Sequence, residues 1–269
     1  MYNDFYGFRE PPFNVTPDPR FLFFSDRHRE AFDHLLYGIR ERKGFVQLTG
    51  EVGAGKTTLC RAILDHLGPR YKTALILNPC MTSTQLLRAI LTELGLEPAR
   101  DRVRCLDRLN RFLLDQVAEG NDVVLLIDEA QDLTLELLEQ VRLLSNLETD
   151  QRKLLQIVLV GQPELRELLD SRRLRQLRQR ITVRFHLGPL SYDETAHYIR
   201  HRIHVSGGNS RPSFDRRAVR RVYRYSGGVP RLINAVCDKT LLCGYVEETA
   251  HLTARHVRRS IRELEGTAA

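Results

Sequence analysis

Short, mostly apolar runs alternate with longer amphipathic stretches along the first two thirds of the chain. The runs cover residues 44–49, 73–78, 122–127, 153–160 and 181–185. The first four are nearly continuous, which is typical of strands buried on both faces of a parallel sheet, whereas the fifth alternates. Between the runs, apolar residues recur at helical spacing, as in a helix expected over residues 133–147. The pattern therefore predicts an α/β fold in which helices sandwich a parallel sheet.

Beyond Gly188 and Pro189 the pattern predicts helices only. Ser191 and Glu194 fit the capping box S-x-x-E and would open a helix over residues 196–204. Further helices are expected over residues 214–225, 230–242 and 254–264. We therefore expect two domains, a core with an aromatic N-terminal segment over residues 1–188 and an all-helical lid domain over residues 189–269.

The first apolar run leads into a sequence that matches the phosphate-binding pattern G-x-x-x-x-G-K-[ST]. Glycines let backbone N–H groups turn toward a phosphate, and the N-terminus of the following helix favours negative charge. The lysine would reach the β- and γ-phosphates of a nucleotide, and the next hydroxyl would bind Mg²⁺. A glycine-rich turn is the alternative, which the flanking strand and helix make remote. The candidate nucleotide-binding residues are Gly50, Glu51, Val52, Gly53, Ala54, Gly55, Lys56, Thr57 and Thr58.

The third run, residues 122–127, ends in two acids, Asp128 and Glu129. Asp128 would hold the Mg²⁺ shell together with Thr57, and Glu129 would polarise the attacking water. A pair of solvated loop acids is the alternative, and the phosphate-binding pattern upstream makes it remote. ATP and Mg²⁺ are therefore the expected cofactors.

Gln162 stands just beyond the fourth run, residues 153–160. A polar side chain at the tip of this strand would lie beside the γ-phosphate, so Gln162 is a candidate sensor. A turn residue before a helix that starts at Pro163 is the competing interpretation, and both stay open.

Residues 1–24 hold eight aromatic residues among prolines that exclude a continuous helix. An irregular segment this apolar must pack onto the rest of the protein. Core packing is the expected role for most of these rings. Lining an adenine pocket is the alternative, because the phosphate-binding pattern lies just downstream.

Composition describes a globular protein of 269 residues, of which 42% are hydrophobic and 28% charged. No apolar run approaches the ~18 residues needed to span a bilayer, and no secretory leader is evident. Five cysteines without a C-x-x-C pair suit reduced thiols. We therefore expect a cytoplasmic protein, either free or peripheral at the inner membrane.

The net charge of +7 comes with a concentration of arginines between Arg166 and Arg231. A basic face for nucleic acid or anionic lipid is one interpretation. An arginine-rich subunit interface with solvated helix faces is the other, and the sequence leaves both open.

The order of these motifs resembles that of the AAA+ ATPases. More narrowly, the N-terminal stretch FYGFREPPFN, residues 5–14, is similar to the ExeA family, also called general secretion pathway protein A. The likeness continues through residues 28–31, 36–38, 44–58, 128–131, 158–165 and 227–234 and so spans nearly the whole chain. It implies an ATPase that drives assembly or regulation of a bacterial secretion or envelope-polysaccharide export system, with a partner at the inner membrane.

The resemblance also implies roles for three arginines. Arg180 or Arg178, at the end of the helix before the last strand, matches the arginine finger that points into a neighbour's nucleotide site. We favour Arg180 because it directly precedes the strand. Arg231, in the sequence G-V-P-R, matches the second sensor of the lid. An arginine finger that acts on a neighbouring copy implies homo-oligomers, which would be ring-like or helical. For each of these arginines, a surface salt bridge is the alternative role.

The chain departs from the family at its end. Members continue into a membrane-spanning helix and a periplasmic peptidoglycan-binding region, whereas this chain ends at Ala269. We therefore expect either a short member or a truncated piece of a longer one. The alternative function is an ATP-dependent DNA-binding adaptor related to transposition regulators, which share this core; the arginine density motivates it.

Overall fold

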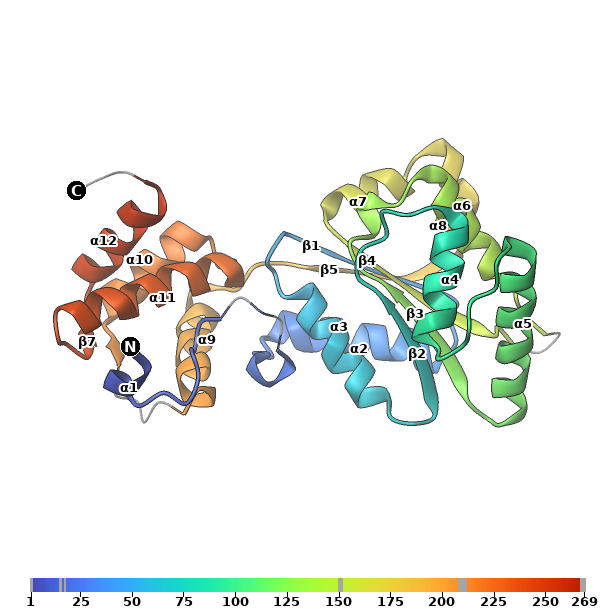
Figure 1. The fold of residues 1–269 in the computed structure, drawn as a ribbon. Coiled ribbons are helices and arrows are strands. Elements are labelled where there is room, and N and C mark those ends of the chain that lie inside the picture. Colours follow the sequence, from blue (N-terminus) through green and yellow to red (C-terminus); the bar gives the residue numbers. More distant parts are fainter. Residues whose placement is uncertain (1, 15, 17, 150–151, 208–211, 267–269) are drawn as a thin grey trace. The chain divides into compact units, whose positions relative to one another are not determined.

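The computed structural model describes residues 2–14, 16, 18–149, 152–207 and 212–266 (Figure 1). The chain divides into two compact units. The sheet unit comprises residues 29–50 and 59–187, and the lid unit comprises residues 1–28, 51–58 and 188–269. Within the described ranges, no helix is both long and apolar enough to cross a membrane.

The sheet unit is built on parallel strands. Among the described residues they run in the order β2-β3-β4-β1-β5. The three interior strands are buried almost throughout, which explains their continuous apolar runs, and the edge strand β5 alternates between buried and exposed residues. The pairing aligns the carboxyl ends of the interior strands at one edge of the sheet. The bounds are β1 (Phe45–Gly50), β2 (Tyr71–Ile76), β3 (Asp122–Ile127), β4 (Leu155–Gly161) and β5 (Ile181–Leu187).

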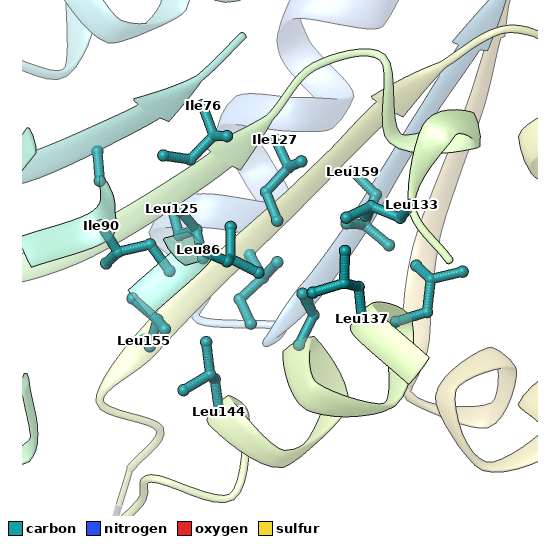
Figure 2. Close-up of a cluster of buried hydrophobic side chains, with 14 of the residues drawn as sticks. Ile76, Leu86, Ile90, Leu125, Ile127, Leu133, Leu137, Leu144, Leu155 and Leu159 are labelled. Carbon is teal, nitrogen blue, oxygen red and sulfur yellow. The ribbon is translucent and has the colours of Figure 1, made fainter. Parts of the chain in front are cut away.

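Helices cover both faces of this sheet (Figure 1). The parts of α2 (Asp26–Arg40) and α3 (Lys56–Leu67) that belong to the sheet unit lie on one face. The other face carries α4 (Ser83–Glu93), α5 (Arg102–Ala118), α6 (Leu135–Leu144), α7 (Pro163–Leu169) and α8 (Arg175–Arg180). Figure 2 shows the core on that face, where Leu125 and Ile127 of β3 face leucine and isoleucine side chains from α4 and α6. The predicted α/β sandwich is confirmed.

The lid unit is mainly helical. The first of its long helices opens with the predicted capping box, in which Ser191 Oγ accepts the N–H of Glu194 and the carboxylate of Glu194 accepts the N–H of Ser191. Two-residue strands, β6 (Ser213–Phe214) and β7 (His251–Leu252), pair in parallel. The helices are α1 (Tyr2–Tyr6), α9 (Tyr192–Val205), α10 (Arg216–Ser226), α11 (Pro230–Val246) and α12 (Ala254–Leu264).

The aromatic N-terminal segment packs within the lid unit. Tyr6, Phe8 and Phe13 are buried in one cluster with residues of α9 to α12. Arg202 of α9, only 6% exposed, donates to the backbone carbonyls of Pro12 and residue 14 at 2.5 and 2.8 Å. These contacts explain why the compact units differ from a division at residue 188. The first 28 residues group with the C-terminal helices because their rings and carbonyls are held there.

Caps set the helix boundaries where they differ from the predicted ones. The helix predicted from residue 133 starts at Leu135, because Thr134 Oγ1 accepts the N–H of Leu137 as an N-cap. The helix predicted from residue 214 starts at Arg216, because the carboxylate of Asp215 accepts the N–H of Ala218. Such shifts of one or two residues follow from side-chain hydrogen bonds that hydrophobic spacing alone does not specify.

Candidate nucleotide-binding site

A buried carboxylate follows β3 at the carboxyl edge of the sheet. Asp128 is 2% exposed, and its Oδ1 accepts the backbone N–H of Glu129 at 2.9 Å. The N–H of Asp128 donates to the carbonyl of Ile76 at 2.8 Å, which continues the pairing of β3 with β2. A carboxylate removed from water must be matched by hydrogen bonds or by a cation. Asp128 is therefore suited to a metal shell.

Glu129 has a left-handed backbone, with φ 49° and ψ 39°. This conformation is uncommon for a residue with a side chain, and it costs about 1–3 kcal/mol. Oε2 of Glu129 accepts from Nε2 of Gln131 at 2.8 Å and from Nε2 of Gln162 at 3.4 Å. Both donors are neutral amides, so they orient the carboxylate and leave it able to attract a proton. An oriented carboxylate at a strand end is suited to act as a base.

Gln131 is a site residue to which the sequence assigns no role. Its Oε1 accepts the backbone N–H of Gln162 at 3.0 Å while its Nε2 donates to Glu129, so one side chain joins the ends of β3 and β4. Gln162 therefore lies beside Glu129, and it is also the residue that precedes Pro163 at the start of α7. Its position is compatible with both interpretations, a sensor of the γ-phosphate and a turn residue before Pro163. The short spacing from Glu129 to Gln131 is the only signal in the sequence, and it does not reveal the contact with a distant strand.

The phosphate loop, residues 51–58, belongs to the lid unit and connects β1 to α3. Gly53 and Gly55 have φ of +78° and +95°, in the region where a side chain would be strained. Lys56, the first residue of α3, is 6% exposed, and its Nζ donates to the carbonyl of Glu51 at 3.0 Å. The ammonium is thus held against the loop at a helix N-terminus, where an anion is stabilised.

Arg231, the predicted lid sensor, contacts this loop through its backbone. Its N–H, in the first turn of α11, donates to the carbonyl of Gly53 at 3.2 Å. The first N–H groups of a helix lack partners within the helix, so the loop caps α11. A Cβ on Gly53 would lie 2.3 Å from the Cβ of Arg231, so the approach requires glycine. Any movement of the loop is therefore coupled to α11.

His28 is a second residue whose role the sequence does not reveal. It is 4% exposed, its Nε2 lies 3.1 Å from the carbonyl oxygen of Ala54 in the loop, and its Nδ1 lies 2.7 Å from Ser25 Oγ. A carbonyl can only accept, so Nε2 carries the proton and Nδ1 accepts from the hydroxyl of Ser25. Burial lowers the pKa of His28, although the bond to Ala54 and the charge of Glu194 act the other way. His28 is a neutral support for the loop.

The two candidate finger arginines both lie in the sheet unit, on α8. Nη1 of Arg180 donates to Ser145 Oγ at 2.6 Å, at the C-terminal end of α6. Arg178 is more weakly held, because its Nη1 is 3.5 Å from Asp170 Oδ1 and its side chain is 41% exposed. Neither arginine contacts a described residue of the Asp128–Gln131 segment through a hydrogen bond or ion pair.

These residues fit a nucleoside triphosphate with Mg²⁺. Gly53 and Gly55 allow the positive φ at which loop N–H groups turn toward an anion, and Lys56 supplies an ammonium at the N-terminus of α3. Asp128 offers a buried carboxylate of the hard-oxygen type that Mg²⁺ prefers. Thr57, half-buried, supplies a hydroxyl one residue beyond the lysine. The loop donors belong to the lid unit and the carboxylate to the sheet unit, and each is of a type that suits a phosphate or its metal.

Comparison with known proteins identifies proteins to which this chain is similar. The model of an AAA domain matches residues 39–169. General secretion pathway protein A of Aeromonas hydrophila is 45% identical over 268 residues, which are 99% of this chain and 49% of that protein. The chain therefore spans about half the length of this curated relative.

Solved structures with the same fold include proteins from three sources. The Aeropyrum pernix ORC2 protein, in its ADPNP-ADP complexes, is 17% identical with a TM-score of 0.69, covering 95% of this chain and 72% of that one. Drosophila ORC bound to DNA is 18% identical with a TM-score of 0.70, covering 96% and 65%. The Thermotoga maritima RuvB branch migration motor is 19% identical with a TM-score of 0.56, covering 90% and 69%. Identities this low show the fold alone.

Fold, loop and carboxylates together define an AAA+ protein of the P-loop NTPase class. Within that class, 99% of this chain is similar to about half of general secretion pathway protein A. The resemblance carried by the N-terminal residues and the nucleotide motifs is confirmed by this match.

The contact between Gly53 and Arg231 predicts a selective effect of Gly53→Ala. We expect ATP affinity to fall by about tenfold or more, because alanine pays about 1–2 kcal/mol for the left-handed conformation and also displaces α11. Gly120→Ala is the matched control, since Gly120 has the same φ of +78° with nothing within 4 Å of its Cβ position. Titration with a fluorescent ATP analogue measures both. Equal losses in the two variants would contradict the role of the contact.

The lowered pKa of His28 predicts a pH dependence of stability. Below about pH 6.5, the usual histidine pKa, the unfolded chain takes up a proton that the folded chain resists. The stability from His28 is therefore present above that pH and is lost as the pH falls further. In His28→Gln, the difference between the melting temperatures measured at pH 7.5 and at pH 5.5 should become smaller than in the unsubstituted protein. His201→Gln is the comparison, because burial lowers the pKa of His201 as well. An unchanged pH dependence in His28→Gln would refute a neutral His28.

Proposed function

We propose that this protein binds ATP with Mg²⁺ and hydrolyses it to ADP and phosphate. The observation that carries the proposal is the arrangement around Glu129, a strained carboxylate oriented by the amides of Gln131 and Gln162. Such a base, beside the buried Asp128, suits activation of water and has no evident structural purpose. The phosphate loop supports the same conclusion.

Each site residue receives a role in this proposal. Lys56 binds the β- and γ-phosphates, and the backbone of residues 50–58 surrounds them. Thr57 and Asp128 would hold the metal, which would offset phosphate charge. Glu129 takes a proton from the attacking water. Gln162 senses the γ-phosphate, and Arg231 transmits its state to the lid through α11.

The proposal includes homo-oligomers, because an arginine supplied by a neighbour would complete the site. Arg180 or Arg178 would stabilise the charge that develops on the γ-phosphate, an effect of about 10³–10⁵ in rate where it has been studied. Arg178 has the weaker contact in its own chain, and Arg180 directly precedes β5. Both remain candidates for the finger.

The name of the relative suggests the system that hydrolysis serves. We infer that the protein drives assembly or regulation of a bacterial secretion or envelope-polysaccharide export system, through a component at the inner membrane. The support is the 45% identity to general secretion pathway protein A along nearly the whole chain. Binding and hydrolysis of ATP would then close and open the interface between neighbouring copies. This change would move an attached partner.

Two substitutions test hydrolysis. Lys56→Ala should weaken ATP binding about 10–100-fold, because it removes charge-assisted hydrogen bonds to phosphate. Glu129→Gln should retain binding and lose about 10²–10⁴-fold in the rate of phosphate release, because an amide takes up no proton. Glu136→Gln, an exposed acid on α6, is the control. Steady-state phosphate release and ATP titration separate the two defects. Full turnover in both site variants would refute the assignment.

Mixing variants tests the finger in trans. Arg180→Ala and Glu129→Gln should each be inactive alone, whereas a mixture should regain activity, because some interfaces then pair an intact Glu129 with an intact arginine. The same mixture with Arg178→Ala tests the other candidate. Phosphate release is measured across a range of mixing ratios. If neither arginine variant loses activity, or if no mixture recovers it, the proposal of a trans finger fails.

A further inference from the structure

The helix α10 concentrates positive charge on the surface of the lid unit. Its eleven residues, RRAVRRVYRYS, include five arginines and no acid. One side of the helix is buried in the lid core through Ala218, Val219 and Val222. The arginines occupy the rest, and four of them are exposed. The whole segment from residue 188 to 269 holds fourteen basic and eight acidic residues, a net charge of +6 out of +7 for the chain.

These arginines have no partners among the described residues. No ion pair or side-chain hydrogen bond in the described ranges involves Arg216, Arg217, Arg220, Arg221 or Arg224. The neighbouring helix α12 is different, because Arg255 and Arg259 pair with Glu247. Like charges one turn apart on a helix repel one another. An external anion of high charge density would relieve this repulsion.

We propose that the arginine face of α10 binds the phosphate backbone of duplex DNA. Arginine suits phosphate because its planar guanidinium donates two parallel hydrogen bonds, and α10 contains arginine without lysine. Residues 217, 220 and 224 follow i, i+3, i+7 spacing and so form one stripe along the helix. A rigid helix presents them in a fixed row to the row of phosphates. Binding is therefore independent of base sequence.

The surroundings of the stripe favour a duplex over a single strand. Single-stranded nucleic acid is held by exposed aromatic rings on which bases stack. The exposed large apolar residues of the described ranges include none from α10, and its two tyrosines, Tyr223 and Tyr225, are half-buried. The helix therefore offers contacts to the backbone and no platform for bases.

The buried side of α10 argues against a membrane as the partner. A helix that lies in a bilayer interface inserts its apolar face among the acyl chains. In α10 that face packs in the lid core against α12 and α11, so it is not available to lipid. An anionic bilayer would then attract the helix by charge alone, without the fixed spacing that a duplex offers.

The test compares two charge-matched pairs of substitutions. Arg220→Gln/Arg224→Gln removes two exposed charges from α10, and Arg88→Gln/Arg111→Gln removes two from α4 and α5. Glutamine retains helix propensity in both. Binding of a fluorescent 30-base-pair duplex is followed by anisotropy between 50 and 200 mM salt, without nucleotide and with ATP. The α10 pair should lose about tenfold or more in affinity, and the slope of log K against log salt should fall by about two units. The α4–α5 pair should change little.

Other outcomes overturn the proposal. Equal losses in both pairs would indicate bulk charge, and no binding at 50 mM salt would exclude the duplex. Tighter binding of a single strand, or binding only to vesicles that contain phosphatidylglycerol, would identify a different partner. Duplex binding by the arginine face of α10 does not require ATP hydrolysis. Lys56→Ala should therefore bind the duplex as the unsubstituted protein does. Failure of the ATPase proposal and failure of this one are therefore distinguishable.

Discussion

Burial of the central strands on both faces is the constraint on which the rest of the structure depends. β1, β3 and β4 have almost no exposed residue, and most of their side chains are apolar. Polar groups that can reach a ligand therefore lie where the strands end, and in a parallel sheet the carboxyl ends lie at one edge. Asp128, Glu129 and Gln162 stand at the ends of β3 and β4, and the phosphate loop starts where β1 ends. The core therefore determines where the site is.

The same constraint makes the strained backbone of Glu129 tolerable. Asp128 continues the pairing with β2, and the amide of Gln131 joins the following turn to the end of β4. These contacts fix the backbone on both sides of Glu129. They offset the conformational free energy that a left-handed residue costs. A carboxylate held in this way loses little orientational freedom when a substrate binds. Rigid placement of this kind is a condition for efficient proton transfer.

The sheet predicted from the sequence is confirmed, and both nucleotide motifs could be found in the sequence, because each depends on local order along the chain. Buried runs predict strands, and G-x-x-x-x-G-K-T and D-E depend on residues that are neighbours in sequence. The contacts of His28 with Ala54 and of Gln131 with Gln162 join residues 26 and 31 positions apart, so no local pattern contains them. The contacts that group the N-terminal segment with the lid helices likewise join residues far apart in the sequence. Aromatic composition predicts that the rings are buried and does not say by which helices.

The arginines show most clearly that amino-acid composition does not predict which charged side chains can bind another molecule. Arg202 is buried and holds the backbone of the N-terminal segment, so its charge is not part of any basic face. Arg180 bonds to a serine of its own chain. The arginines of α10 differ from both. The apolar side of this helix is buried, and on its other side the described residues offer the arginines no acceptor. An arginine is a candidate for binding another molecule when its own chain leaves its donors unmatched. By that criterion the arginine face of α10 differs from Arg180 and Arg202, whose donors are matched within the chain.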